Sequence, residues 1–224
     1  MRGPIYRVLK IPMIKKFAVI FFVLVAVVAR AEEQVQAPVF KEGDFWKFKI
    51  VQKPVPGFSS TANEFPNGTF ILRHDTNARM QLREIIGEKK IFPESPTYRG
   101  YILSIFGLRQ PRSSPTIFNK NLLPFPLYVG KQWQFSYRTK VTNVVNSEVL
   151  AEQTVTTRGG NFQALRIERN NQWAEANPVW GSRVHVTRGT YFYSPEAKIV
   201  VKYDSENDDG FELHIELLEF APAQ

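Results

Sequence analysis

The stretch that decides the fold is Phe211-Glu-Leu-His-Ile-Glu-Leu-Leu-Glu-Phe220, near the C-terminus. Its apolar side chains fall at every second position from Phe211 to Leu217, and Glu or His occupies the positions between them. Successive side chains of a strand point to opposite faces, so this alternation predicts a half-buried β-strand. The alternation changes phase at Leu217-Leu218 and returns Phe220 to the apolar face, which predicts a β-bulge.

The residues before this stretch predict its partner strand. Segment 198–203 is mostly apolar, with Ile199-Val-Val201 between two lysines, and Asp208-Asp209-Gly210 supplies residues that favour turns. We therefore expect 198–203 to pair antiparallel with 211–220 across the turn Ser205–Gly210. Gly210 is expected to take a positive φ, a conformation that only glycine adopts without steric cost.

The same period of two recurs along most of the chain. Turn residues such as Asn67-Gly68 and Gly159-Gly160-Asn161 separate the alternating segments, and fifteen prolines argue against long helices. The fold class predicted is all-β: an antiparallel barrel or strongly curved sheet, lipocalin-like or an open half-barrel, with a β-sandwich as the alternative. Asn77–Ile86 fits either one short helix or another strand. The clearest alternating segments are 46–50, 133–137, 165–167, 184–186 and 211–217.

A partial repeat suggests how the domain is organised. Gly43-Asp-Phe-Trp46-Lys-Phe matches Gly130-Lys-Gln-Trp133-Gln-Phe at an offset of 87 residues. We expect a single β domain over 41–221, with two half-repeats, 41–106 and 127–221, as its internal organisation. Trp46 and Trp133 should then be buried alike. The alternative is that a turn glycine followed by alternating aromatics is simply a common way to begin a strand.

The N-terminus has the pattern of an export signal. Five basic residues precede the apolar run Phe17–Val28, and Ala29-Arg30-Ala31 provides small residues for cleavage. The run is 12 residues long, whereas a helix that spans a bilayer needs about 20. We predict that 1–31 is a signal peptide, that no membrane span remains after cleavage, and that 32–40 is a disordered lead-in. The protein is then exported, either periplasmic or secreted; an uncleaved anchor is the alternative.

Charge and cysteine content exclude several classes of function. The whole chain has a formal net charge of +8, but residues 1–31 hold six basic and no acidic residues. The remaining 193 residues carry 23 basic and 21 acidic side chains, so they are nearly neutral. Such a balance argues against nucleic acid as a partner. The chain has no cysteine, so an exported form relies on its core and not on disulfides.

No motif assigns catalysis, a metal or a cofactor. Three histidines, His74, His185 and His214, lack the close spacing of zinc ligands, and His185 and His214 fall on the polar phase of their strands. The acidic segment 204–210 resembles a calcium loop, but Ile215 stands where a glutamate ligand is expected, so an acidic hairpin tip is the simpler interpretation. We therefore predict no metal and no cofactor, and an enzyme is the less favoured class.

Aromatic residues are the best candidates for ligand binding. Trp173 and Trp180 flank the loop-like stretch 174–178, and a loop aromatic can close a ligand cleft. Tyr191 and Tyr193 follow on an alternating strand. The alternative for all four residues is ordinary packing in the core.

The C-terminal half also resembles a known family. Segment 158–167 has the pattern Gly-x-Phe-x-Ala-Leu-x-Ile, and 189–203 contains Tyr191-Phe-Tyr193-Ser-Pro195-Glu196. Over about 125–220, these hairpins resemble uncharacterised exported bacterial β-rich proteins, in which Trp is frequent where Phe192 stands here. The resemblance implies a β-fold of the cell envelope and no catalytic residues. The first half shows no comparable match.

Three functions are compatible with these observations. The first is non-catalytic binding of an apolar or amphipathic ligand, lipid-like or glycan-like, within the curved sheet. The second is a scaffold or assembly factor that contacts other envelope proteins through strand edges or loops. The third is a hydrolase without a recognisable motif.

Overall fold

The computed structural model describes residues 33–53, 68–74, 80–85, 105–106, 123–138, 141–177 and 181–223. Gln34–Gln224 form one compact unit, and every described strand belongs to it. The predicted signal peptide, 1–31, lies outside the described residues, and so does Trp180. Within the described part of the chain, no helix has the length and apolarity to cross a bilayer.

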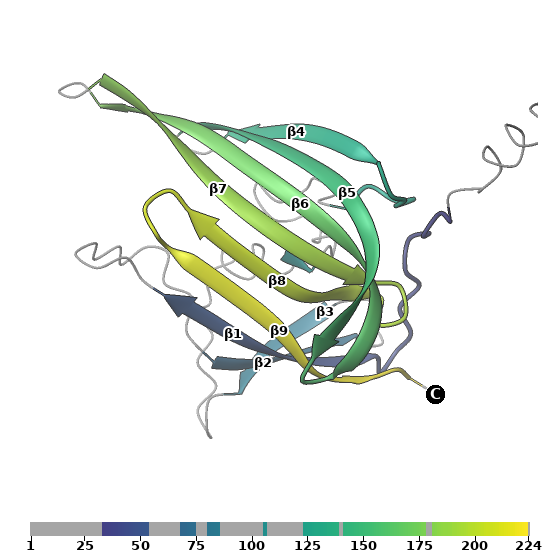
Figure 1. Cartoon of the computed structure of the whole chain (residues 1–224). Helices are drawn as coiled ribbons and strands as arrows, with labels where there is room; N and C mark the ends of the chain where they lie inside the picture. The colour runs from purple at the N-terminus through teal and green to yellow at the C-terminus, as the bar shows by residue number, and fades with distance from the viewer. Residues whose placement is uncertain are drawn as a thin grey trace, which may run out of the picture. The chain divides into compact units, whose positions relative to one another are not determined.

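The unit is built on a single antiparallel sheet of nine strands (Figure 1). Neighbours follow the order β3-β2-β1-β9-β8-β7-β6-β5-β4, so two runs of consecutive hairpins meet where β1 pairs with β9. Strands β5 and β6 are long and bend visibly along their length (Figure 1). The strands are β1 (Phe45–Lys53), β2 (Gly68–His74), β3 (Met80–Ile85), β4 (Gln132–Arg138), β5 (Thr142–Thr157), β6 (Gly160–Asn177), β7 (Gly181–Ser194), β8 (Ile199–Asn207) and β9 (Glu212–Ala221).

This architecture confirms the all-β prediction in its open, curved form. β3 and β4 stand at opposite ends of the strand order and do not pair with each other, so the sheet is not closed into a barrel. The described strands form one sheet, in place of the two sheets of a sandwich. Of the two interpretations of Asn77–Ile86, the strand is correct over Met80–Ile85. Helical conformation in the described part is limited to Ile105.

The C-terminal hairpin forms as predicted. β8 and β9 pair antiparallel, with Tyr203 opposite Ile215 and Ser205 opposite Leu213. The turn is shorter than expected, because Ser205 and Glu206 still belong to β8. Gly210 has a φ of 86°, as its position in the turn requires. Leu213, Ile215 and Leu217 are buried, whereas Phe211 is only half-buried at the strand's start.

The predicted bulge joins the last strand to the first. Lys47 pairs with Glu219 but Phe48 pairs with Leu217, so Leu218 is the extra residue of β9. The shift turns Phe220 back towards the core, where its ring stacks on that of Trp46 with centroids 6.0 Å apart. Without the bulge, one side of the β1–β9 pair would expose its apolar side chains.

One face of the sheet carries the core, and the N-terminal segment contributes to it. Phe106 packs on Phe48 with ring centroids 4.1 Å apart. Val35 forms a bridge with Leu127, and the Phe40 ring meets that of Trp46 edge-on at 5.7 Å. Residues of 33–40 therefore contact the core at two positions, and the disordered lead-in over 32–40 stays a prediction. Two apolar side chains of this segment gain more by burial against the core than by staying in water.

Trp46 and Trp133 share a local conformation but not the same burial. Gly43 and Gly130, each three residues before its tryptophan, have φ values of 91° and 89°. Trp46 is 0% exposed and donates from Nε1 to the Ala197 carbonyl at 2.7 Å. Trp133 is only partly buried, because β4 is the end strand of the sheet. Equal burial was therefore wrong, and the duplication itself stays a prediction.

A buried carboxylate ties three distant segments together. Asp44 is 0% exposed and accepts hydrogen bonds from Lys41 N at 2.8 Å, Ala223 N at 3.0 Å and Lys198 Nζ at 2.8 Å. Burial by itself raises the pKa of this carboxyl, but the hydrogen bonds from Lys198, Ala223 and Lys41 outweigh it and hold the pKa below its ordinary value. Asp44 is therefore ionised in the fold and links the segments before β1 and after β9 to the turn before β8.

The two tryptophans should respond differently to truncation. Trp46→Ala should lower the free energy of unfolding by about 3–5 kcal/mol, as expected for a fully buried aromatic side chain. Trp133→Ala should cost clearly less, since its ring is only partly buried. Urea unfolding followed by circular dichroism measures both. Equal losses would contradict the difference between an inner and an end strand.

Replacing Asp44 should have a pH-dependent effect. Its folded-state pKa lies below that of the unfolded chain, so the stabilisation is present above about pH 4 and is lost as the pH falls through the folded pKa. Asp44→Asn should thus be less stable than the wild type at pH 7, and the difference should shrink below pH 4. Glu219→Gln, at a carboxylate whose side chain is 57% exposed, is the control. A loss at Asp44→Asn that did not change with pH would contradict this account.

Candidate functional site

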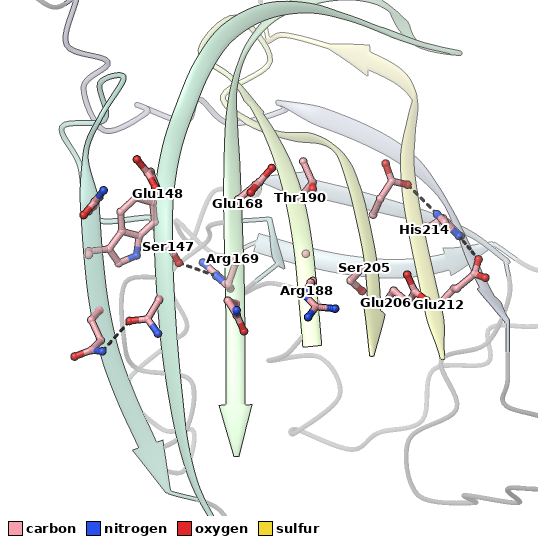
Figure 2. Close-up of a pocket in the computed structure, with 17 residues that line it drawn as sticks. Ser147, Glu148, Glu168, Arg169, Arg188, Thr190, Ser205, Glu206, Glu212 and His214 are labelled. Atoms are coloured by element: carbon pink, nitrogen blue, oxygen red, sulfur yellow. Dashed lines mark hydrogen bonds and ion pairs between the residues drawn. The ribbon is translucent and has the colours of Figure 1, made fainter. Parts of the chain in front are cut away.

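Six strands line a broad polar cavity, which we call the polar trough (Figure 2). Its volume is about 1060 Å³, at the upper end of the range for small-molecule sites. β4, β5, β6, β7, β8 and β9 each contribute residues. The lining residues are Gln132, Trp133, Gln134, Asn146, Ser147, Glu148, Glu168, Arg169, Asn170, Arg188, Gly189, Thr190, Asp204, Ser205, Glu206, Glu212 and His214.

Strand register arranges most of these residues in two rows across the sheet. Residues directly opposite each other in antiparallel strands project from the same face. The rows lie on the face opposite the core, because Leu213, between Glu212 and His214, is buried. The first row is Gln132, Glu148, Glu168, Thr190, Asp204 and His214. The second row is Gln134, Asn146, Asn170, Arg188, Glu206 and Glu212.

The trough carries more negative than positive charge. Five carboxylates line it, and Arg188 lies in the same rows, whereas the Arg169 guanidinium packs on the ring of Tyr191 on the other face. Cations beside the trough neutralise some of them: Lys53 Nζ lies 2.6 Å from Glu212, and Lys202 Nζ lies 3.4 Å from Asp204. Arg166 Nη2 also lies 2.5 Å from Glu168, so three of the five carboxylates are paired with cations, and the site mainly favours groups that donate hydrogen bonds.

His214 stands between two of these carboxylates (Figure 2). Its Nδ1 lies 2.8 Å from Asp204 and its Nε2 lies 3.0 Å from Glu212. The hydrogen bonds to Asp204 and then Glu212 raise the pKa of this imidazole above its ordinary value. His214 lies on the polar face of β9, as predicted, and links the two rows at the β9 end of the trough.

Asn170 presents an unused acceptor in the middle of the second row. Its Oδ1 is buried and makes no hydrogen bond to any part of the chain that the structure describes. A buried amide oxygen without a partner costs free energy, so such a group is expected to be satisfied when a site is filled. Asn170 lies opposite Asn146 on β5 and Arg188 on β7, so its neighbours in the row are also polar.

The residues predicted to bind a ligand lie elsewhere. Tyr191 and Tyr193 are 4% and 1% exposed and belong to the core, where the Tyr191 ring lies 4.3 Å from that of Tyr203. Burial raises the pKa of the Tyr193 hydroxyl well above its usual range. Trp173, Tyr191 and Tyr193, the predicted residues that the structure describes, do not line the trough, and the role of all four in binding stays a prediction. The stretch 174–177 is strand and not loop, since β6 runs to Asn177.

His185 differs from its predicted position. It is 8% exposed, whereas Val184 beside it is 59% exposed, so the polar and apolar phases are reversed at this end of β7. The reason is its strand partner: His185 lies opposite Trp173, and the two rings stack with centroids 5.2 Å apart. The expectation of an exposed histidine was therefore wrong.

Comparisons with known proteins give distant structural matches. No family model matches, so the resemblance to an exported β-rich family stays a prediction. No curated protein matches either. Among solved structures, a candidate lipoprotein of Parabacteroides distasonis is 14% identical with a TM-score of 0.38, and a candidate exported protein of Bacteroides fragilis with a YmcC-like fold is 12% identical with a TM-score of 0.36. Each match covers 84% of this chain and 99% of the other.

The raised pKa of His214 gives a testable pH dependence. Because its folded-state pKa exceeds that of the unfolded chain, its stabilisation is complete below about pH 6.5 and is lost as the pH rises through the folded pKa. An NMR titration of the His214 ring should show a pKa above 6.5. Asp204→Asn should lower that pKa, because it removes the larger of the two causes. A His214 pKa at or below 6.5 in the wild-type protein would contradict the two hydrogen bonds from its ring to Asp204 and Glu212.

Proposed function

We propose that this is an exported, non-catalytic binding protein whose polar trough holds a hydroxyl-rich ligand of saccharide type, neutral or cationic. The observation that carries the proposal is the cavity of about 1060 Å³ with two rows of hydrogen-bonding side chains and the unused acceptor Asn170 Oδ1. Carboxylates and amides bind vicinal hydroxyl groups well, because each oxygen accepts a hydrogen bond and each amide also donates.

The polar lining favours the glycan-like ligand over the lipid-like one. The core face of the sheet is filled by its own side chains, including Phe48, Phe106 and Tyr193. The large apolar residues exposed in the described part are Val39, Val129, Leu150 and Val184, which lie on separate segments and do not mark one docking patch. An acyl chain in the trough would leave its carboxylates and amides without hydrogen-bond partners.

Charge narrows the ligand class further. Of the five trough carboxylates, Glu148 and Glu206 form no ion pair with described residues, so an anionic ligand would meet repulsion at these two positions. A neutral or amino sugar would instead replace bound water by hydrogen bonds to the same oxygens. The predicted signal sequence supports export of the protein. An exported protein of this kind would meet its ligand in the cell envelope or outside the cell.

Binding should depend on Asn170 and on the charge of the ligand. Isothermal titration with neutral, amino and uronic-acid oligosaccharides should detect binding of the first two groups and not of the third. Asn170→Ala should weaken binding about fivefold or more, the loss of one net hydrogen bond of roughly 1 kcal/mol. Gln163→Ala, at an exposed position of the same strand outside the trough, is the matched control.

Two results would contradict a saccharide ligand in the polar trough. Binding of a fluorescent fatty acid, with no response to any oligosaccharide, would favour the apolar ligand and overturn the proposal. Equal effects of Asn170→Ala and Gln163→Ala would place a ligand outside the trough.

A further inference from the structure

We propose a second site, distinct from the polar trough: a divalent transition-metal site formed by His185, Asp208 and Asp209, with zinc as the reference ion. It lies where the turn between β8 and β9 meets β7. His185 Nδ1 lies 3.5 Å from Asp208 Oδ1 and 3.6 Å from Asp209 Oδ2. The three ligand atoms all lie within 4.8 Å of one another.

The separations suit ligands around an ion better than direct hydrogen bonds. A nitrogen or oxygen ligand lies about 2.1 Å from zinc, so two ligands at the tetrahedral angle lie about 3.4 Å apart. Both nitrogen-to-oxygen distances at His185 are close to that value. A hydrogen bond between the same atoms would bring them to about 2.7–3.2 Å.

Arg183 holds the two carboxylates in the required orientation. Its Nη2 lies 3.6 Å from Asp208 Oδ2 and 3.1 Å from Asp209 Oδ1. These are the carboxylate oxygens that do not face His185, so each aspartate uses one oxygen for Arg183 and keeps the other for the metal. The guanidinium also reduces the repulsion between two neighbouring carboxylates. Arg183 is thus a positioning residue and not a ligand.

The other side of the site is fixed by packing and by the turn. The His185 ring stacks on Trp173 at an interplanar angle of 14°, which aims Nδ1 at the carboxylates. Asp208 N donates to the Val186 carbonyl at 3.0 Å and ties the turn to β7. Asn207 Oδ1 accepts from Asp209 N at 3.0 Å and from Phe211 N at 2.8 Å. A rigid support of this kind is what orients metal ligands.

His214, another histidine of the sheet, lies closer to its carboxylates than His185 does to Asp208 and Asp209. His214 makes hydrogen bonds to carboxylates from both ring nitrogens, at 2.8 and 3.0 Å. That arrangement is a hydrogen-bonded ion pair, and no ion fits between atoms so close together. His214→Gln is therefore a matched control, since it removes an imidazole near two carboxylates without touching the proposed ligands.

The ligand set selects the class of metal. One imidazole nitrogen and two carboxylate oxygens suit Zn²⁺, Co²⁺ or Ni²⁺, whereas Ca²⁺ takes six to eight oxygen ligands. The side chains of Asp208 and Asp209 are 26% and 27% exposed, so water can complete the coordination. The sequence predicted an exposed histidine at position 185 and no metal, because the three histidines lack the close spacing of zinc ligands.

The test uses the full chain, prepared without a histidine tag and stripped with a chelator. Titration with zinc chloride should show one equivalent bound, and cobalt chloride should produce visible d–d absorption. Asp208→Asn/Asp209→Asn should weaken zinc binding at least tenfold, and His185→Gln should do the same and abolish the cobalt band. His214→Gln should leave zinc affinity unchanged.

Three results would overturn the proposal: no zinc binding to the wild type, a preference for calcium over zinc, or equal loss in His214→Gln. The double aspartate variant changes only the partly exposed turn, so it remains informative if His185→Gln fails to fold.

Discussion

The pairing of β1 with β9 is the constraint on which the rest of the structure depends. It joins the first and last strands of the unit and unites two runs of hairpins in one sheet. The pairing sets Phe48 and Ile50 opposite Leu217 and Ile215, and the bulge at Leu218 then brings Phe220 opposite Trp46. A single extra residue therefore keeps Phe220 on the core face at the end of the β1–β9 pair.

The strand pairings place apolar and polar side chains on opposite faces of the sheet. The face with the tyrosines and large apolar residues is closed by its own core. The opposite face aligns carboxylates, amides, Arg188 and His214 in two rows across six strands, which gives the polar trough its hydrogen-bonding character. The proposed ligand site therefore lies on the polar face, whereas the predicted aromatic candidates Tyr191 and Tyr193 belong to the core.

Alternation within each strand was enough to predict much of the fold. It identified the C-terminal hairpin, the positive φ of Gly210, the bulge at Leu217-Leu218 and the burial of Trp46. These features depend on near neighbours along the chain. The burial of Trp133 depends on the place of β4 at the end of the sheet, and strand order is not encoded in the alternation of a single strand.

The candidate sites depend on contacts between strands and could not be predicted in the same way. In Val184-His185-Val186 the pattern alone puts the valines inside, but the partner Trp173 turns His185 inwards. The rows of the trough combine residues from Gln132 to His214, which only the pairing of six strands brings into line. Polar residues at alternate positions, such as Glu168 and Asn170, were visible in the sequence, yet nothing in it showed that they align with Arg188 or Glu148.

Cysteine cross-linking tests the β1–β9 register most directly, because the chain has no cysteine of its own. Lys49→Cys with Glu216→Cys joins residues that are opposite with or without the bulge, and serves as the positive control. With the bulge, Lys47→Cys should form a disulfide with Glu219→Cys on mild oxidation, and not with Leu218→Cys. A cross-link from position 47 to position 218 in place of 219 would contradict the register and, with it, the placement of Phe220 beside Trp46 on the core face.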